Sequence, residues 1–178
     1  VSSWTGIAGD DHVPGVREWQ SLISGDSAVE SGGDGKRGGG FLYYGPGRCL
    51  SKLPPRYLAG LSTSCQAAIL IDRADNDASH RRESKQDTNK SKDEVELERP
   101  LQVAALFSLA GCQSVLLNLW PSTLHNNRRI FCSLFRGWGE ECLTLGDAVS
   151  AIRGEVALKP RARFCTVLYG LPTLKFGE

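Results

Sequence analysis

Four short runs of mainly apolar residues are spaced along the chain from residue 41 onward. They cover residues 41–44, 65–71, 114–120 and 164–170, and each ends at or just before a Gly, Pro or Asp residue. Apolar residues follow one another in these runs instead of alternating with polar ones, which is typical of strands buried on both faces of a sheet. We therefore predict four strands of a sheet that is covered on both sides.

Segments with helical spacing lie between these runs. Pro100 stands near the first turn of one of them and Gly111 follows its last turn, which are the usual start and stop residues of a helix. Ser122 or Thr123 can cap another. The helices are expected over residues 54–61, 98–110, 122–135 and 145–158. Strands that alternate with helices predict an α/β fold of three layers, with a mostly parallel sheet and right-handed crossovers.

A strongly charged segment, residues 73–99, interrupts this alternation. It holds seven Lys or Arg and eight Asp or Glu among 27 residues, and its apolar residues are few. Such a segment cannot offset the entropy of ordering by burial, so we predict an inserted charged loop. The basic triplet His80-Arg81-Arg82 is largely cancelled by acidic neighbours.

The first 39 residues contribute little apolar material. Six of the ten residues from Ser31 to Gly40 are glycine, a composition typical of a flexible linker. Residues 16–24 are an exception, because Val16, Trp19 and Ile23 fall on one face of a possible short helix. We predict that residues 1–39 are a flexible glycine-rich arm, and that this short helix is at most a docking element.

Charge and length exclude several classes of protein. Lys and Arg number 21 against 20 Asp and Glu, so bulk attraction to nucleic acid or to a membrane surface is not expected. The sequence has neither a signal peptide nor an apolar run near the roughly 18 residues of a membrane helix, which predicts a soluble intracellular protein. The 178 residues include no Met, even at position 1, and we interpret the chain as the C-terminal piece of a larger protein.

The cysteines do not form a recognisable site. They show no C-x-x-C pair and no accompanying His pair, so neither a zinc site nor any other metal site is predicted. Cys65, Cys112, Cys132 and Cys165 lie in apolar segments, where a free thiol behaves as a small hydrophobic group. We expect reduced core cysteines. No cofactor is predicted either, because the glycine run lacks the P-loop pattern and precedes its strand instead of following it.

Reactive groups of an open parallel sheet gather at the carboxyl ends of its strands. The first predicted strand is followed by Gly45-Pro46-Gly47, the second by Asp72 and Arg73, and the third by a Trp-Pro-Ser-Thr turn. None of these ends carries a Cys or a His. The pattern therefore predicts no nucleophile and base at this edge.

The second half of the chain resembles the caspase-like CHAT peptidase family, which is related to separase. The resemblance rests on residues 110–123, on Leu145-Gly-Asp-Ala-Val149 and on Val167-Leu-Tyr-Gly170. It implies a caspase-like fold in which a His-Gly follows the first strand and a Cys follows the second. Here Pro46 stands in place of the His, and Asp72 or Arg73 in place of the Cys. The resemblance thus implies a pseudo-peptidase that is not an enzyme, with no catalytic residue to assign.

Five ordered motifs resemble the C-terminal region of the cilia- and flagella-associated protein 46 family of large axonemal proteins. They lie at residues 40–45, 65–72, 97–101, 114–121 and 167–172. The resemblance covers about residues 40–174, which we take as the caspase-like domain with its charged insert at 73–99. It implies a structural, protein-binding module of the central apparatus in the axoneme of a cilium or flagellum. The implied partners are other central-apparatus proteins and, indirectly, microtubules, with no nucleic acid and no membrane.

The binding surface is not identified by the sequence. We expect contacts through the charged insert, through the arm with Trp4 and Trp19, and through exposed aromatic residues such as Trp138. Two alternatives remain open. One is an active CHAT-type cysteine peptidase that recruits Cys112 and His125, although the predicted strand between them would hold them apart. The other is a nucleotide-regulated α/β signalling domain.

Overall fold

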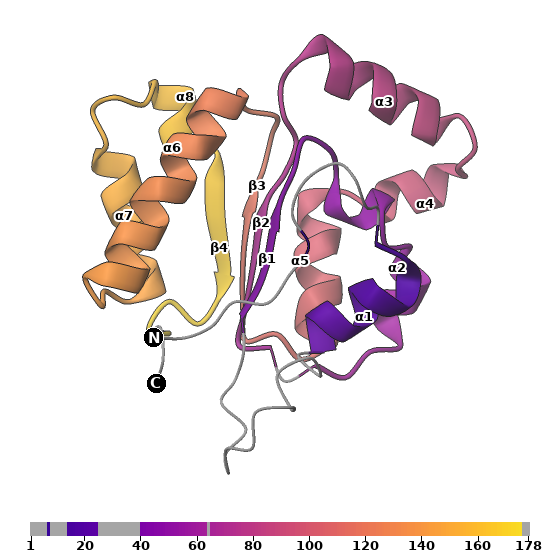
Figure 1. The fold of residues 1–178 in the computed structure, drawn as a ribbon, viewed down its shortest axis with the longest axis horizontal. Helices are drawn as coiled ribbons and strands as arrows, with labels where there is room; N and C mark the ends of the chain where they lie inside the picture. Colours follow the sequence, from indigo (N-terminus) through magenta and orange to yellow (C-terminus); the bar gives the residue numbers. More distant parts are fainter. Residues whose placement is uncertain (1–6, 8–13, 25–39, 64, 176–178) are drawn as a thin grey trace.

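The structure is a computed structural model that describes residues 7, 14–24, 40–63 and 65–175. Four strands form one sheet in the order β1-β2-β3-β4, seen nearly edge-on in Figure 1. The strands are β1 (Gly40–Tyr44), β2 (Ala67–Ile71), β3 (Ser114–Asn118) and β4 (Thr166–Gly170). The first three strands are parallel, and β4 runs antiparallel to β3.

Helices cover both faces of this sheet (Figure 1). On one face lie α1, α2 and α5, and on the other lie α6, α7 and α8. The bounds are α1 (Val16–Ser24), α2 (Pro55–Ala59), α3 (Asp77–Asp87), α4 (Lys92–Leu97), α5 (Pro100–Leu109), α6 (Leu124–Phe135), α7 (Leu145–Gly154) and α8 (Pro160–Arg163). Short turns of other helix types lie at η2 (Cys49–Ser51) and η3 (Arg136–Glu140). The predicted three-layer α/β fold with a mostly parallel sheet is confirmed.

Two hydrophobic cores, one on each face, account for the continuous apolar runs. In β2, Ala68 and Leu70 belong to the core that contains Phe107 of α5. Their neighbours Ile69 and Ile71 belong to the core beneath α6 and α7. All five residues of β2 are buried, because successive side chains of a strand point to opposite faces and both faces are covered.

Helix α1 corrects the prediction that this short helix is at most a docking element, because it contributes to the core. Trp19 and Ile23 are buried, and the Trp19 ring lies 6.1 Å from that of Phe41. The hydroxyl of Thr63 also donates a hydrogen bond of 2.6 Å to the carbonyl of Ile23. Trp19 is thus a core residue rather than an exposed docking residue. The glycine run at 31–39 and Trp4 lie outside the described residues.

The charged segment also differs from its prediction, because it forms the helices α3 and α4 and not an irregular loop. Asn76 caps α3 by accepting a hydrogen bond from the amide of Ser79. Ser91 and Glu94 form a reciprocal capping box at the start of α4. Capping and ion pairs stabilise this segment where apolar burial cannot. Trp138 was expected to be an exposed aromatic residue that contacts partners, but it is buried, with only 3% of it exposed. None of the helices in the described part is both long enough and apolar enough to span a membrane.

Candidate functional site

The loops that follow β1, β2 and β3 meet at one edge of the sheet and are joined by backbone hydrogen bonds. The amide of Gly45 donates to Ile71 at 3.1 Å, and the amide of Ala74 donates to Pro46 at 3.0 Å. The amide of Ser122, in the loop after β3, donates to Arg73 at 2.9 Å. The structure thus brings together Pro46, Asp72 and Arg73, the residues that the resemblance aligns with a catalytic pair.

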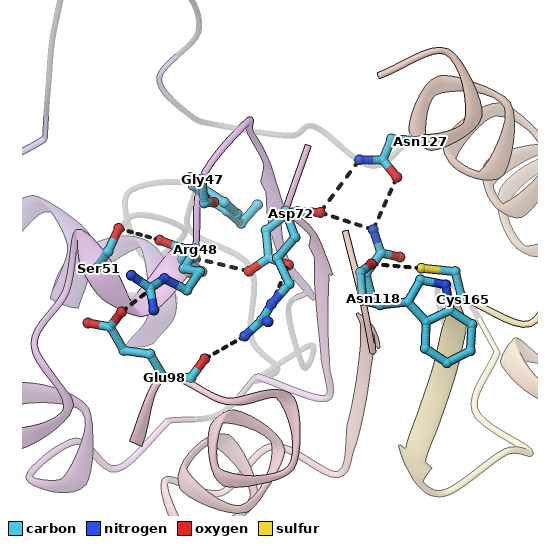
Figure 2. A network of polar contacts seen from close by, with 12 residues as sticks. Gly47, Arg48, Ser51, Asp72, Glu98, Asn118, Asn127 and Cys165 are labelled. Carbon is cyan, nitrogen blue, oxygen red and sulfur yellow. Dashed lines mark hydrogen bonds and ion pairs between the residues drawn. The ribbon is translucent and has the colours of Figure 1, made fainter. Parts of the chain in front are cut away.

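Asp72 is buried at this edge, and its carboxylate points toward the turn that contains Arg48 (Figure 2). Its carboxylate accepts a hydrogen bond of 3.1 Å from the amide of Cys49. Its backbone carbonyl accepts 3.0 Å and 3.5 Å hydrogen bonds from the side-chain amides of Asn118 and Asn127. Burial raises the pKa of Asp72 to about 6, because the charged form loses solvation, and nearby Arg73 opposes this only in part. Asp72 therefore organises the edge as an acceptor in the interior.

Arg73 has the left-handed backbone angle φ +62°, which is uncommon for a residue other than glycine. Its guanidinium donates a hydrogen bond of 2.6 Å to the backbone carbonyl of Glu98, just before α5. Backbone strain of this kind persists only where surrounding contacts hold it. In this chain the contacts tie the end of β2 to the junction between α4 and α5.

Charged residues around the buried Arg48 and Glu98, which Figure 2 shows, fasten the α3–α4 segment to the same edge. Glu98 is only 2% exposed, and its carboxylate lies 3.2 Å from the Nε atom of Arg48. Lys90 pairs with the same carboxylate, while Arg48 also pairs with Asp87 on α3. Each buried charge thus has an opposite charge beside it, which is the condition for tolerating such groups in an interior.

Two cysteines lie at this edge, although no Cys directly follows any of the first three strands in the sequence. Cys49 follows the turn after β1, and its amide contacts Asp72. Cys165 directly precedes β4, and its thiol donates a 3.0 Å hydrogen bond to the carbonyl of Trp120. The sequence prediction missed Cys165 because β4 is antiparallel, so its first residues lie where the other strands end. Burial raises the pKa of both thiols, which keeps them protonated and weakly nucleophilic.

The histidines do not complete a catalytic pair with these thiols. His80 contacts Asp75 at 3.0 Å, and His125 is exposed in the first turn of α6. None of the hydrogen bonds found among the described residues joins a thiol to an imidazole. Cys112 precedes β3 and His125 follows it, and six residues of extended chain alone separate Cys112 from Asn118 by about 20 Å. The alternative pair is therefore not brought together.

The edge leaves no room for a ligand beside Asp72. The hollow bounded by Asp72, Arg73, Pro100 and Asn118 has a volume of about 10 Å³. This is the space that one water molecule needs, whereas sites for small molecules are some thirty times larger or more. Within the described ranges, no three His, Cys, Asp or Glu residues are arranged to hold a metal ion.

The remaining cysteines are divided between interior and surface. Cys65 and Cys112 are buried at the amino ends of β2 and β3, and the thiol of Cys65 donates a hydrogen bond of 3.1 Å to the carbonyl of Ala67. Cys132 was expected in the core but is exposed, because it lies on the outer face of α6, while Ile130 and Leu134 face the sheet. The expected core position therefore holds for Cys49, Cys65, Cys112 and Cys165, whereas Cys132 and Cys142 are exposed.

The chain is similar in sequence to a curated protein. It is cilia- and flagella-associated protein 46 of Chlamydomonas reinhardtii, 35% identical over 79 residues, which are 44% of this chain and 3% of the relative. The chain therefore spans a small fraction of that protein's length. No protein-family model matches the sequence.

Solved structures identify the fold. Two crystal structures of the Saccharomyces cerevisiae separase–securin complex superimpose with TM-scores of 0.53 and 0.51, both at 24% identity. The matches cover 76% and 74% of this chain and 8% of the separase chain in each case. The fold is caspase-like. At this level of identity the structural similarity extends to the fold alone, and the chemistry has to be argued from the residues at the edge of the sheet.

Proposed function

We propose that this chain is a non-catalytic protein-interaction module of a large ciliary scaffold, placed in the central apparatus of the axoneme. The similarity to cilia- and flagella-associated protein 46 supports the ciliary part of this proposal. The small share of that relative that the chain matches supports a module of a much longer protein. Its partners would be other central-apparatus proteins and, through them, microtubules.

The carboxyl ends of the strands leave no room for a substrate, and this observation supports the proposal that the domain is not catalytic. A cysteine peptidase needs a thiolate and a base in contact, next to a cleft that admits a peptide. Here Pro46 stands at the position aligned with the His and Asp72 or Arg73 at the position aligned with the Cys, and the hollow beside Asp72 has room for about one water molecule. The buried pair of Arg48 and Glu98 further holds the α3–α4 segment against this edge. These features favour a domain that retains its packing and acts through its surface.

Fractionation of cilia tests the location. An antibody raised against residues 100–178 would be used on immunoblots of isolated axonemes and of the detergent-soluble cell fraction. We expect a band far above the 19.3 kDa of this chain that stays with the axoneme and is released only by high salt. A band near that mass, confined to the soluble fraction, would contradict the proposal.

A peptidase assay tests the absence of catalysis separately. The chain would be incubated with a mixture of fluorogenic peptides, with and without iodoacetamide, beside the variants Cys49→Ser and Cys112→Ser. We expect no turnover that depends on a thiol. Turnover that iodoacetamide blocks and that either variant abolishes would establish the peptidase alternative instead. A nucleotide titration that raises the melting temperature would favour the signalling alternative.

A further inference from the structure

Two buried cysteines occupy matching positions at the amino ends of neighbouring parallel strands. Ala67 of β2 and Ser114 of β3 are paired in register, and Cys65 and Cys112 each lie two residues before one member of this pair. Both cysteines belong to the hydrophobic core on the same face of the sheet, with exposed fractions of 4% and 5%. The register of the two strands therefore brings the two side chains together.

Backbone contacts on either side of the cysteines fix this arrangement. Before them, the amide of Thr63 donates a hydrogen bond of 2.8 Å to the carbonyl of Ala110. After them, the amide of Ser114 donates a hydrogen bond of 2.9 Å to the carbonyl of Gln66. The two backbones also approach closely at Gly111, where an added Cβ would lie 2.8 Å from the carbonyl oxygen of Thr63. The two segments that contain the cysteines are thus joined to each other at both ends.

The spacing of the strands meets the geometric requirement of a disulfide bond. Neighbouring strands of a sheet lie about 4.8 Å apart, and the two Cα atoms of a disulfide are usually about 4.4–6.8 Å apart. Both thiols are free in the structure, and that of Cys65 donates its hydrogen bond to the carbonyl of Ala67. Formation of the bond therefore requires the side chains to rotate and does not require the strands to separate.

The two thiols differ in acidity. Contact with the Cys112 side chain lowers the pKa of Cys65, although burial opposes this effect, whereas contact with Cys65 raises the pKa of Cys112. The thiolate is the form of cysteine that attacks an oxidant, and a second thiol beside it then completes a disulfide. Cys65 is accordingly the thiol that reacts first, and Cys112 is the thiol that resolves the intermediate. Their small exposed fractions favour a small oxidant.

We infer that Cys65 and Cys112 form an oxidation site, at which a small hydroperoxide converts the two thiols into a disulfide between β2 and β3. Cys65 loses its proton, and its thiolate attacks one peroxide oxygen and becomes a sulfenic acid. The other peroxide oxygen leaves with its electron pair and takes up that proton. The Cys112 thiol then attacks the sulfenic sulfur, the S–S bond forms, and the sulfenic hydroxyl leaves with the Cys112 proton as water. The two thiols lose two electrons in all, and the hydroperoxide gains them.

The disulfide would tie β2 to β3 across a long loop. Cys65 and Cys112 are 47 positions apart, and α3, α4 and α5 lie between them. A bond that closes a loop of this length stabilises the fold, mainly because it restricts the unfolded chain. The oxidised domain should therefore melt at a higher temperature than the reduced one. This inference goes beyond the proposed function and does not depend on where in the cell the protein lies.

Mass spectrometry after peroxide treatment tests the inference. The 178-residue chain, in which Cys132→Ser and Cys142→Ser remove the exposed thiols, is treated with hydrogen peroxide, unfolded with a thiol-blocking reagent and digested without reduction. We expect one linked pair of peptides, containing Cys65 and Cys112, that is lighter by two hydrogen atoms than the two reduced peptides together. The treated protein should melt at least about 5 °C higher than the reduced protein. Dithiothreitol should reverse both changes.

Single variants in the same background supply the controls. Cys65→Ser keeps a donor for the hydrogen bond to Ala67, so circular dichroism should show a folded protein. Peroxide should give this variant neither the linked peptides nor the higher melting temperature, and Cys112→Ala should behave in the same way. The matched control is Cys49→Ser, which removes another buried thiol and should retain both effects.

Several results would overturn the inference. They are the absence of the linked peptides, a link between other cysteines, an unchanged melting temperature, or the same rise in Cys65→Ser. Glutathione disulfide serves as the bulky oxidant, and a mixed disulfide between glutathione and Cys65 would overturn the assignment of a small hydroperoxide. Peroxide added after unfolding in urea should produce several cysteine pairs, because the strand register no longer selects the partner. The same single pair under those conditions would show that the fold does not direct the reaction.

Discussion

Glu98 is the buried carboxylate on which the attachment of the α3–α4 segment depends. Its carboxylate lies 3.2 Å from Arg48, with exposed side-chain fractions of 2% and 9%. At an effective dielectric constant of about 20, two unit charges at this distance attract by about 5 kcal/mol before the loss of solvation is subtracted. Replacing either residue by Met leaves the other charge buried with one opposite charge fewer. We expect each single variant to lose about 3–5 kcal/mol of unfolding free energy.

Urea unfolding of a double-mutant cycle measures this coupling. Arg48→Met combined with Glu98→Met removes both charges and puts apolar groups in their place. The double variant should therefore lose at least 2 kcal/mol less than the sum of the single losses. If a single variant does not fold at all, the double variant should still do so, because its interior no longer holds an unbalanced charge.

An exposed ion pair supplies the matched control for the cycle. Arg99 lies 2.9 Å from Glu96, and their side chains are 66% and 41% exposed. Arg99→Gln should cost less than about 0.5 kcal/mol, since water screens the pair. Losses below 1 kcal/mol in both single variants of the buried pair, comparable to this control, would refute the argument that the pair holds the segment in place.

Three other variants test separate parts of the structure. Burial raises the pKa of Asp72 to about 6, above the ordinary 3.8, so the folded chain binds this proton more tightly than the unfolded chain. The wild type should consequently gain stability relative to Asp72→Asn as the pH falls from 7 to 4, and parallel pH profiles in urea unfolding would contradict this. Gly170 has φ +103°, and an added Cβ would lie 2.1 Å from a backbone oxygen. Gly170→Ala should therefore lower the melting temperature by at least 5 °C. In the control Gly154→Ala the new Cβ meets nothing within 4 Å, so the melting temperature should stay unchanged or rise. Leu134→Ala should lower the free energy of unfolding in urea by about 2–5 kcal/mol, because Leu134 is fully buried. Cys132→Ala, on the opposite and exposed face of α6, should lower it by less than about 0.5 kcal/mol. Equal losses would mean that the orientation of α6 is wrong.

Local sequence signals were sufficient for most of the regular structure. The run at residues 65–71 predicted β2 because a strand covered on both faces must be apolar at successive positions. Thr123 caps α6 as expected, by accepting a hydrogen bond from the amide of Asn126. The composition of the charged segment predicts a loop, whereas its capping residues favour helices, and the Ser91-x-x-Glu94 capping box is present in the sequence itself.

The sequence by itself thus determined the strands, most of the helices and the absence of a His or Cys directly after β1 and β2. Only the tertiary structure decided which residues meet at the edge of the sheet. Arg48 and Glu98 are 50 positions apart and lie in segments with no shared pattern, so their pairing follows from how the chain returns to one edge. The sequence also does not predict the antiparallel direction of β4, which brings Cys165 to that edge. The pattern of apolar residues indicates which positions are buried, but it contains no information about strand direction.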